Sequence, residues 1–367
     1  MNRDDLAGYL ALNACPGVGP VGFRKLTEAG DFNINNFINS SAKQLFALGL
    51  KDQQIAALKN PPQQIIDNAL TWLESDPAHH ILTLSDPNYP ELLKELKDAP
   101  PILYATGKIE LLSNPQIAMV GSRNCTPGGA STAHEFASYL TSAGLTITSG
   151  MALGIDKHAH QGALDAPGNT IAVIGTGIDR IYPSKNKKLA YQIAQDGLII
   201  SEFPLGTPPL SENFPKRNRI ISGLSLGTLV IEATRKSGSL ITARCSMEQG
   251  REVFAIPGSI HNPQAKGCHH LIREGAKLVD QASDIIDDIG SLLGFVAQQT
   301  ETTNTSEATT LDTDYQQLLD KIGYDPVSIE TLVQRCGLTI AQLSSMLLIL
   351  ELNEQIKMAP GGLYFRC

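Results

Sequence analysis

The stretch that decides the fold is Gln116-Ile117-Ala118-Met119-Val120-Gly121-Ser122-Arg123. Its apolar run ends at a glycine, and the chain then becomes polar. Further short apolar runs rich in Val and Ile, each leading toward a helical pattern, lie at Leu145–Thr148, Ile171–Ile174, Leu198–Ile200, Thr228–Ile231 and Glu252–Ile256. Short apolar strands alternating with helices are typical of a parallel sheet that is covered on both faces. The sequence therefore predicts an α/β core built on a doubly wound parallel sheet.

Small and polar residues follow the predicted strands at their carboxyl ends. These ends are Gly121-Ser122-Arg123, Ser149-Gly150, Gly175-Thr176-Gly177, Ser201-Glu202-Phe203 and Glu232-Ala233. Open α/β sheets bind ligands beyond the carboxyl ends of their strands. Glycine and small hydroxyl residues leave backbone amides accessible to an anion. We therefore expect a phosphate-binding edge on an extended Rossmann-like parallel sheet core.

The loop Gly121-Ser122-Arg123 differs from the common mononucleotide-binding loops. Arg123 stands where a second glycine would allow a pyrophosphate to lie against bare backbone, and no Gly-Lys-Ser/Thr motif is present in the chain. An arginine can instead offer a planar fork of donors to a single phosphate. The alternative is an arginine that only pairs with a nearby carboxylate such as Asp156. Phosphate binding is the favoured interpretation.

A second candidate segment concentrates positive charge around an aromatic residue. Lys216, Arg217 and Arg219 lie within four residues, next to Phe214 and Asn218. Cations beside an aromatic ring suit a single-stranded nucleic acid, whose backbone is tracked while its bases stack. A solvated helix face is the alternative interpretation. Ser237-Gly238-Ser239, placed before another predicted helix, would add a further anion site.

Enzyme chemistry has weaker support in the sequence. Glu232 at a strand end could be a catalytic carboxylate, or could hold an arginine in place. Asp156 and His160 stand one helical turn apart, so we expect them to form a structural pair. No nucleophile with a base and an orienting group is evident, and no set of metal ligands has suitable spacing. We therefore expect no catalytic residues, no metal and no cofactor.

The flanking segments predict separate domains. Residues 1–75 read as short helices, and Cys15-Pro16-Gly17-Val18-Gly19 predicts a helix-hairpin-helix (SAM-like) turn, whose glycines and Arg24 would either contact phosphate or only pack. We expect the core over 76–296, with 76–114 as its connector, and a flexible polar linker over 297–311. Three helical patterns and a glycine-turned hairpin over 312–367 predict a winged helix. Because residues 296–367 carry nine acidic and four basic groups, protein contact or plain structure is favoured there over DNA reading.

Composition bounds the class of protein. The 367 residues include 42% hydrophobic residues, enough for a sizeable core, and the formal net charge is −8. That charge argues against a general nucleic-acid coat, so partners should be bound locally, near the basic residues of 180–219. The six cysteines form no Cys-x-x-Cys pair. With no signal peptide and no membrane-spanning run in the sequence, we expect a cytoplasmic protein with reduced thiols.

Taken together, these motifs resemble the DNA-processing protein A family (DprA, also called Smf). The resemblance covers about 200 residues in order. It rests on Val-Gly-Ser-Arg at 120–123, Ser149 to His160, Gly-Thr-Gly at 175–177, Tyr-Pro at 182–183, Ser-Glu-Phe-Pro at 201–204, Asn213 to Ile221, Ser237 to Ala243, Gln249 to Gly258, and Gly267-Cys268 with Leu271 to Ala276.

The resemblance implies a protein that binds single-stranded DNA, forms homodimers and loads the recombinase RecA during natural transformation. By similarity, Arg123 is the main phosphate ligand and Phe214 lies beside the strand. The cations that would line the same pocket are Lys185, Lys216, Arg217 and Arg219. The dimer surface is expected near His269, Ile272 and Leu278. The family implies no catalytic activity, although its core also resembles nucleotide phosphoribohydrolases, which leaves an enzyme using Glu232 as the alternative.

Overall fold

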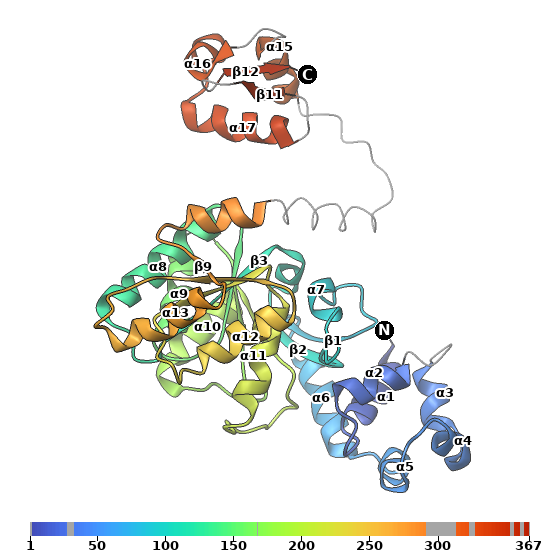
Figure 1. The fold of residues 1–367 in the computed structure, drawn as a ribbon. Coiled ribbons are helices and arrows are strands. Elements are labelled where there is room, and N and C mark those ends of the chain that lie inside the picture. The colour runs from blue at the N-terminus through green and yellow to red at the C-terminus, as the bar shows by residue number, and fades with distance from the viewer. Residues whose placement is uncertain are drawn as a thin grey trace. The chain divides into compact units, whose positions relative to one another are not determined.

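The computed structural model describes residues 2–27, 33–166, 168–290, 313–322, 327–352, 356–359 and 363–366. They form two compact units, residues 1–298 and 299–367 (Figure 1). The predicted linker over 297–311 lies outside the described residues, and the domain boundary predicted at residue 75 stays a prediction. Among the described residues, no helix has the length and apolar character needed to cross a bilayer.

The first unit is built on one sheet. Nine of the described strands form it in the order β1-β2-β6-β5-β4-β3-β7-β8-β9. Their bounds are β1 His79–Thr83, β2 Ile102–Gly107, β3 Gln116–Gly121, β4 Thr146–Ser149, β5 Thr170–Val173, β6 Leu198–Ser201, β7 Gly227–Ile231, β8 Glu252–Ala255 and β9 Lys277–Leu278. Strands β3 to β9 pair in parallel, which confirms the predicted α/β core.

The strand order reverses beside β3. From β3 the chain proceeds through β4, β5 and β6 on one side, and then crosses to β7, β8 and β9 on the other. In register, Ile117 lies beside Gly227 and Gly121 lies beside Ile231. The carboxyl ends of β3 and β7 therefore meet at the switch point of the sheet, where helices leave toward opposite faces and open a crevice.

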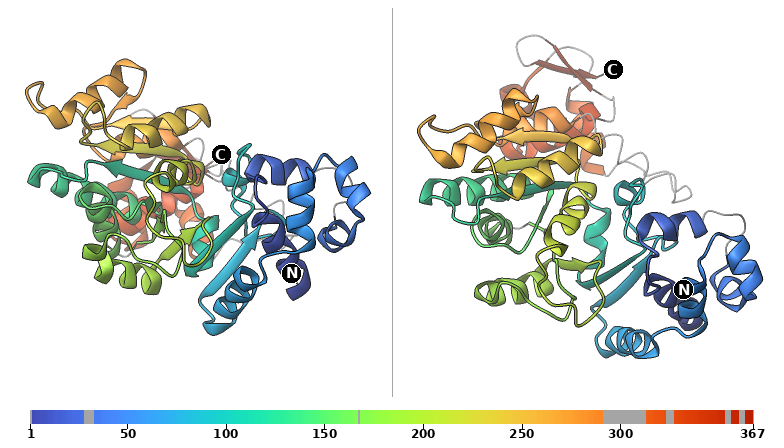
Figure 2. Two further views of the ribbon diagram at one scale, coloured as in Figure 1. Left: turned by 90° about the horizontal axis from the view of Figure 1, so that it is seen from below. Right: turned by 60° about the horizontal axis from the view of Figure 1, so that its bottom comes forward.

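Helices cover both faces of the sheet (Figure 2). One face carries α8 Pro127–Ser142, α9 Ile155–Asp165 and α10 Lys187–Asp196, and the other carries α7 Glu91–Lys94, α11 Asn213–Gly223, α12 Ser239–Glu248 and α13 Lys266–Arg273. Short 3-10 turns are η1 Ile109–Ser113, η2 Ser184–Asn186 and η3 Pro263–Ala265. On β5, Ile171 and Val173 face the α11 side, whereas Ala172 faces α10. This alternation explains why the central strands are apolar on both faces.

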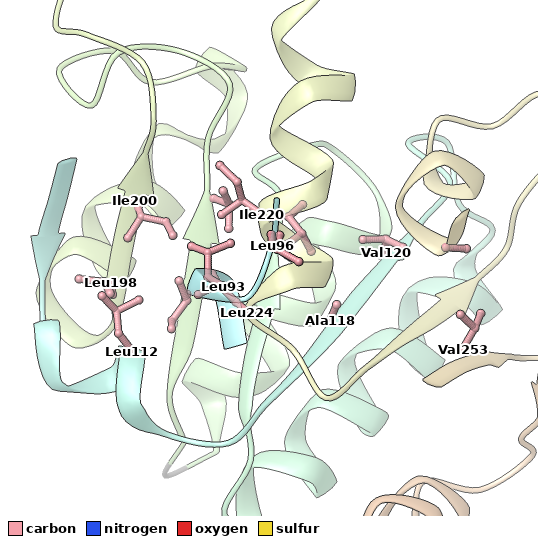
Figure 3. Packing of buried hydrophobic residues seen from close by; sticks show 14 of the residues in the cluster. Leu93, Leu96, Leu112, Ala118, Val120, Leu198, Ile200, Ile220, Leu224 and Val253 are labelled. Carbon is pink, nitrogen blue, oxygen red and sulfur yellow. The ribbon is translucent and has the colours of Figure 1, made fainter. Parts of the chain in front are cut away.

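The α11 side of the sheet shows how the core is filled. Leu93, Leu96, Ile220 and Leu224 converge on the strands there, together with Val120 of β3 (Figure 3). All five side chains are buried. Their packing fixes α11 on the sheet, and α11 supplies one wall of the candidate site.

Three outer strands were not expected: β9 at one edge of the sheet, and β1 and β2 at the other. The segment predicted to be a connector contributes β1 and β2, which pair with each other and with β6 in antiparallel fashion. The apolar run Ile102-Leu103-Tyr104-Ala105 forms β2, and these four residues are buried. The parallel sheet therefore has an antiparallel extension at the edge that faces the N-terminal helices.

The N-terminal helices pack on that extension. Their bounds are α1 Arg3–Asn13, α2 Pro20–Thr27, α3 Ile34–Asn39, α4 Ala42–Ala47, α5 Asp52–Lys59 and α6 Gln63–Ser75. Their cluster of buried side chains includes Ile81 of β1 and both Ile102 and Tyr104 of β2. The helices and the sheet thus share a continuous apolar interface in the first unit.

The predicted turn between α1 and α2 is present, and its arginine faces the protein. Gly17 has φ of 76°, a conformation that favours glycine. Arg24 donates hydrogen bonds from Nη1 to the carbonyl oxygens of Lys94 and Leu96, at 2.9 and 2.6 Å. These bonds attach α2 to the chain after α7. Of the two interpretations of this turn, packing is the one that the contacts of Arg24 support.

The second unit is the predicted winged helix. It contains α15 Thr313–Ile322, α16 Ile329–Cys336 and α17 Ile340–Leu352, and a sheet of order β10-β12-β11 made of β10 Val327–Ser328, β12 Leu363–Arg366 and β11 Ile356–Ala359. Leu332, Leu343, Leu347 and Leu350 are among the buried residues of its own core. The glycines expected in the hairpin turn, at 361 and 362, lie outside the described residues.

Candidate functional site

The loop after β3 is fixed by close backbone contacts. A β-carbon on Gly121 would lie 1.9 Å from the carbonyl oxygen of Ile231 in β7, so only glycine fits at this position. The amide of Ile155, at the start of α9, donates to the carbonyl oxygen of Ser122 at 3.1 Å. On the other side, the Gln264 side chain donates to the carbonyl oxygen of Asn124. The loop is therefore held by β7, α9 and the turn at Gln264.

Arg123 follows Ser122 on this fixed loop. The residue is exposed, and within the described part of the chain its side chain makes no hydrogen bond or ion pair. The structure has no direct ion pair between Arg123 and Asp156, although the Arg123 charge acts to lower the pKa of that buried carboxyl against the effect of burial. Its guanidinium is available to an external ligand, and its position is set by a loop with little freedom.

A pocket of about 820 Å³ opens beside Arg123, at the switch point of the sheet. The walls come from the loop after β3, from the first turns of α11 and from the start of α12. The residues expected at the ligand site that line it are Gly121, Ser122, Arg123, Phe214, Arg217, Asn218, Ser237, Gly238 and Ser239.

Two buried charges form the inner end of this pocket. Asp156 and Arg217 both line it, and they are 7% and 6% exposed. Arg217 donates through Nη1 to the carbonyl oxygen of Val173, and Asp156 accepts from the amide of Ala152 at 3.2 Å. Burial lowers the pKa of Arg217 to about 10, and the adjacent Asp156 opposes that shift. Arg217 therefore stays protonated at neutral pH and acts mainly as part of the pocket floor.

Gly150 makes this floor possible. A β-carbon there would lie 2.5 Å from Arg217 Nη1 and equally close to Asp156 Oδ2. Burial raises the pKa of Asp156 above its ordinary value, while the Arg217 charge acts in the opposite direction. The two groups compensate each other across the space that the glycine leaves. Gly150 thus supports the pocket from behind and does not line it.

The other predicted ligand residues outside the lining have different positions. Lys185 and Lys216 are exposed, while Ser149 is buried and donates to the carbonyl oxygen of Met119. A β-carbon on Gly175 would lie 2.9 Å from the Phe214 ring, and one on Gly177 would lie 2.5 Å from an Asp179 oxygen. These glycines therefore allow neighbouring groups to approach.

Arg219 is engaged by carboxylates. Its Nε lies 3.0 Å from Asp98 and its Nη2 lies 2.6 Å from Glu202, and the side chain is only 13% exposed. Burial raises the pKa of Glu202, and the Arg219 charge opposes this. Lys216 and Arg219 are three residues apart on α11, yet their surroundings differ. Lys216 is exposed to solvent, whereas Arg219 is paired with Asp98 and Glu202.

The start of α12 forms the third wall. Ser237 and Ser239 lie on either side of Gly238, with their hydroxyl oxygens 2.6 Å apart. The first turn of a helix carries amide groups without intrahelical acceptors and the positive end of the helix dipole. The wall at the start of α12, which lines the same pocket as Arg123, can therefore also hold negative charge.

Glu232 has a structural role. One carboxylate oxygen accepts from the Thr126 amide at 2.7 Å, and the other accepts from the Thr126 hydroxyl at 2.5 Å. Thr126 is the residue that caps α8. Glu232 has φ of 53° and does not line the pocket. Its two carboxylate oxygens connect the end of β7 to the start of α8. The hydrolase interpretation needs Glu232 in the pocket, and the structure does not place it there.

The prediction that Asp156 and His160 form a pair is wrong. His160 is buried, with Nδ1 2.6 Å from the Thr170 hydroxyl and Nε2 2.6 Å from the Gly150 carbonyl oxygen. One helical turn does bring two residues to one face, but the sheet supplies nearer partners for the ring. Among the described residues, no group of acidic, histidine and cysteine side chains could hold a metal ion.

Several pocket residues were missed from the sequence. Tyr182, Pro209, Ser211, Thr234 and Gln264 also line it. Tyr182 belongs to the Tyr-Pro pair that contributed to the family resemblance, and that pair was the available signal. The others lie on loops or, for Gln264, in the short turn η3, and the course of these segments depends on the tertiary fold.

The fold and pocket define a class: an α/β protein with a polar ligand site at the switch point of its sheet. The family described as DNA recombination-mediator protein A matches residues 80–290, and the DprA winged helix domain matches residues 302–362. The chain belongs to this family of DNA-processing proteins.

Individual relatives agree with that assignment. Protein Smf of Escherichia coli is 40% identical over 316 residues, covering 86% of this chain and 84% of the relative. The DNA processing protein DprA of Streptococcus pneumoniae is 50% identical over 204 residues, covering 56% and 72%.

Two solved structures are also similar. The X-ray structure of DprA from Streptococcus pneumoniae has a TM-score of 0.67 at 40% identity, covering 76% of this chain and 97% of that one. A structure of DNA processing protein A from Helicobacter pylori, described for its single-stranded DNA binding mode, has a TM-score of 0.53 at 32% identity, covering 58% and 96%.

His160 predicts a specific pH dependence. Burial lowers its pKa to about 4, below the 6.5 of an unfolded histidine. As pH falls from 6.5 toward 4, the unfolded chain binds a proton that the folded chain excludes, so the free energy of unfolding should fall by roughly 3 kcal/mol. Above 6.5 this group contributes no pH dependence. Chemical denaturation across this range for wild type and His160→Gln should show the extra slope in wild type alone, and equal slopes would contradict the assignment.

Proposed function

We propose that this protein binds single-stranded DNA through its phosphates, in the pocket where β3 and β7 end. The observation that carries the proposal is Arg123: an exposed arginine that lines a pocket and whose side chain has no hydrogen-bond or ion-pair partner among the described residues. A charge-assisted fork of this kind matches a phosphate group. The Helicobacter pylori relative, described for its single-stranded DNA binding mode, supports the choice of ligand.

The remaining pocket residues divide by chemistry. Ser122 and the Ser237–Ser239 turn would donate to phosphate oxygens, and Phe214 would contact a base. Lys185 and Lys216, exposed outside the pocket, would attract the strand over a longer range. Arg217 and Arg219 would act by holding the floor and α11 in place, because their guanidinium groups already face partners in the protein. Fewer cations are therefore proposed to contact phosphate directly than the sequence indicated.

The pocket lining combines anion-binding and apolar residues, which suits a nucleic-acid strand better than a single mononucleotide. Arg123 and the start of α12 both favour anions and both line the pocket. Aromatic and apolar side chains, Phe214, Pro209 and Ile241, line it as well. Alternation of anion-binding and apolar surface is the pattern expected for a chain of phosphates and bases.

We further propose that the bound strand is handed to the recombinase RecA in the cytoplasm, during natural transformation or homologous recombination, by a homodimer. The dimer surface would be formed by α13 and β9, which contain His269, Ile272 and Leu278. β9 is the last strand of the sheet, and Leu278 on it is 53% exposed. An edge strand with an exposed leucine is a surface that a second copy can cover.

Replacement of Arg123 should weaken binding to oligothymidylate. We expect Arg123→Ala to lower affinity by about 10- to 100-fold, because charge-assisted hydrogen bonds to a phosphate are lost. The affinity of Arg123→Lys should lie between those of wild type and Arg123→Ala, since lysine keeps the charge and lacks the planar guanidinium that can donate two hydrogen bonds to one phosphate. A salt titration should show a slope smaller by about 0.7 for one phosphate contact. Arg244→Ala, at an exposed position on α12 outside the pocket lining, is the control; wild-type binding by Arg123→Ala would place the site elsewhere.

Introduction of a charge at Leu278 should separate the dimer. Leu278→Asp would place a carboxylate in an apolar contact, and we expect the dimer dissociation constant to rise at least about tenfold in sedimentation equilibrium. Phe46→Asp, at a residue of α4 that is 64% exposed and far from the proposed surface in sequence, is the matched control. Dimers of unchanged stability in Leu278→Asp would remove β9 from the interface.

A further inference from the structure

Tyr182 is a large aromatic residue exposed at the candidate pocket. It lines the pocket and is 49% exposed. Its ring centroid lies 5.7 Å from that of Phe214, with the ring planes tilted by 40°. The two rings are in contact as a tilted pair, and about half of the Tyr182 side chain stays exposed beside Phe214. The Tyr182 side chain is not part of the buried core.

The backbone that carries Tyr182 is nevertheless fixed. Before it, the Thr176 hydroxyl donates to the carbonyl oxygen of Arg180 at 2.8 Å. After it, the buried Asn186 side chain donates to the carbonyl oxygens of Met151 and Ala152, at 2.9 and 3.1 Å. Hydrogen bonds therefore hold the chain on both sides of Tyr182, by a turn at Thr176 before it and by the residues after β4 behind it. An exposed ring on a fixed segment is the arrangement that stacks a ligand with little loss of conformational entropy.

The neighbouring Phe214 ring packs against the backbone. Phe214 lies over Gly175, where a β-carbon would come within 2.9 Å of the ring. Phe214 is part of α11, which also contributes Arg217 to the floor. The two aromatic side chains therefore come from different elements and meet at one side of the pocket. Arg123 lines the same pocket from the loop after β3.

Positive charge continues past Tyr182 along the chain. Lys185, Lys187 and Lys188 are exposed, on η2 and at the start of α10. The Lys187 ammonium lies 5.8 Å from the centre of the Tyr191 ring, on the same helix. None of these lysines has a carboxylate partner in the described ion pairs. The surface beyond Tyr182 therefore attracts a polyanion.

We propose that Tyr182 is a base-stacking residue, which holds a nucleobase of the single strand at the mouth of the pocket and directs the strand toward Lys185, Lys187 and Lys188. The inference rests on the proposed function, because it needs a single strand with phosphates at Arg123. Stacking on an aromatic ring tolerates any base, since each base has a π face. The site therefore adds affinity and footprint length without adding sequence preference.

Abasic DNA separates base stacking from phosphate binding. The probes are oligothymidylate and a strand of equal length in which each thymidine is replaced by a tetrahydrofuran abasic unit. Tyr182→Ala should weaken binding of oligothymidylate by about 5- to 100-fold, the range for loss of one base–aromatic stack. Binding of the abasic strand should not change. Tyr182→Phe, which keeps the ring, should bind both strands as wild type does.

A matched control and a folding check accompany this test. Tyr139→Ala removes a tyrosine of α8 that is 51% exposed and does not line the pocket, and it should leave both affinities unchanged. Because Tyr182 is half-exposed, thermal unfolding of Tyr182→Ala should occur at a midpoint close to that of wild type.

The outcomes for this inference and for the proposed function are distinguishable. If Arg123→Ala weakens binding of both strands while Tyr182→Ala changes both equally or neither, the stacking role is overturned and the phosphate site stands. If neither variant changes the affinity for oligothymidylate, both proposals fail. Loss of oligothymidylate binding alone in Tyr182→Ala supports the stacking residue.

Discussion

The close approach of Gly121 to Ile231 is the contact on which the candidate site depends. A β-carbon at that glycine would lie 1.9 Å from a backbone oxygen of the neighbouring strand. Such a clash could be relieved only by separating β3 from β7 or by displacing the loop. Because the two strands meet at the switch point, this contact sets the position of the next residues, Ser122 and Arg123. The geometry of the pocket mouth thus follows from backbone packing.

Charge in the site is arranged in two layers. Asp156 and Arg217 are buried together, and Arg217 also donates to the backbone of β5. Burying either charge alone would be costly, so the pair supports the pocket when both are present. Arg123 remains outside this pair and exposed. The inner layer therefore stabilises the shape of the site, while Arg123 is the charge that we propose to bind an anion.

The sequence was most informative where the signal is local. Short apolar runs predicted β3 to β8 because a strand covered on both faces must be apolar on both faces. The glycine and serine residues after β3 and before α12 indicated the pocket edge, because strand ends in a doubly wound sheet converge. The winged helix followed from its helical periodicity and glycine-turned hairpin.

Features that depend on distant partners could not be predicted from the sequence. Arg217 and Arg219 look equivalent in the run of cations, yet one contacts Val173 and the other contacts Asp98 and Glu202. His160 was paired with the wrong residue for the same reason, since its partners come from the sheet. Tertiary contacts decide which polar side chains of a helix meet the solvent.

The central claim is that a single strand is held by a phosphate at Arg123, between the loop after β3 and the start of α12. The most direct measurement is a crystal structure of the full-length protein with a short oligothymidylate. We predict a phosphate within hydrogen-bond distance of the Arg123 guanidinium, with the strand in the pocket lined by Ser237, Gly238 and Ser239. A strand bound on another surface, with this pocket free of DNA, would contradict the account.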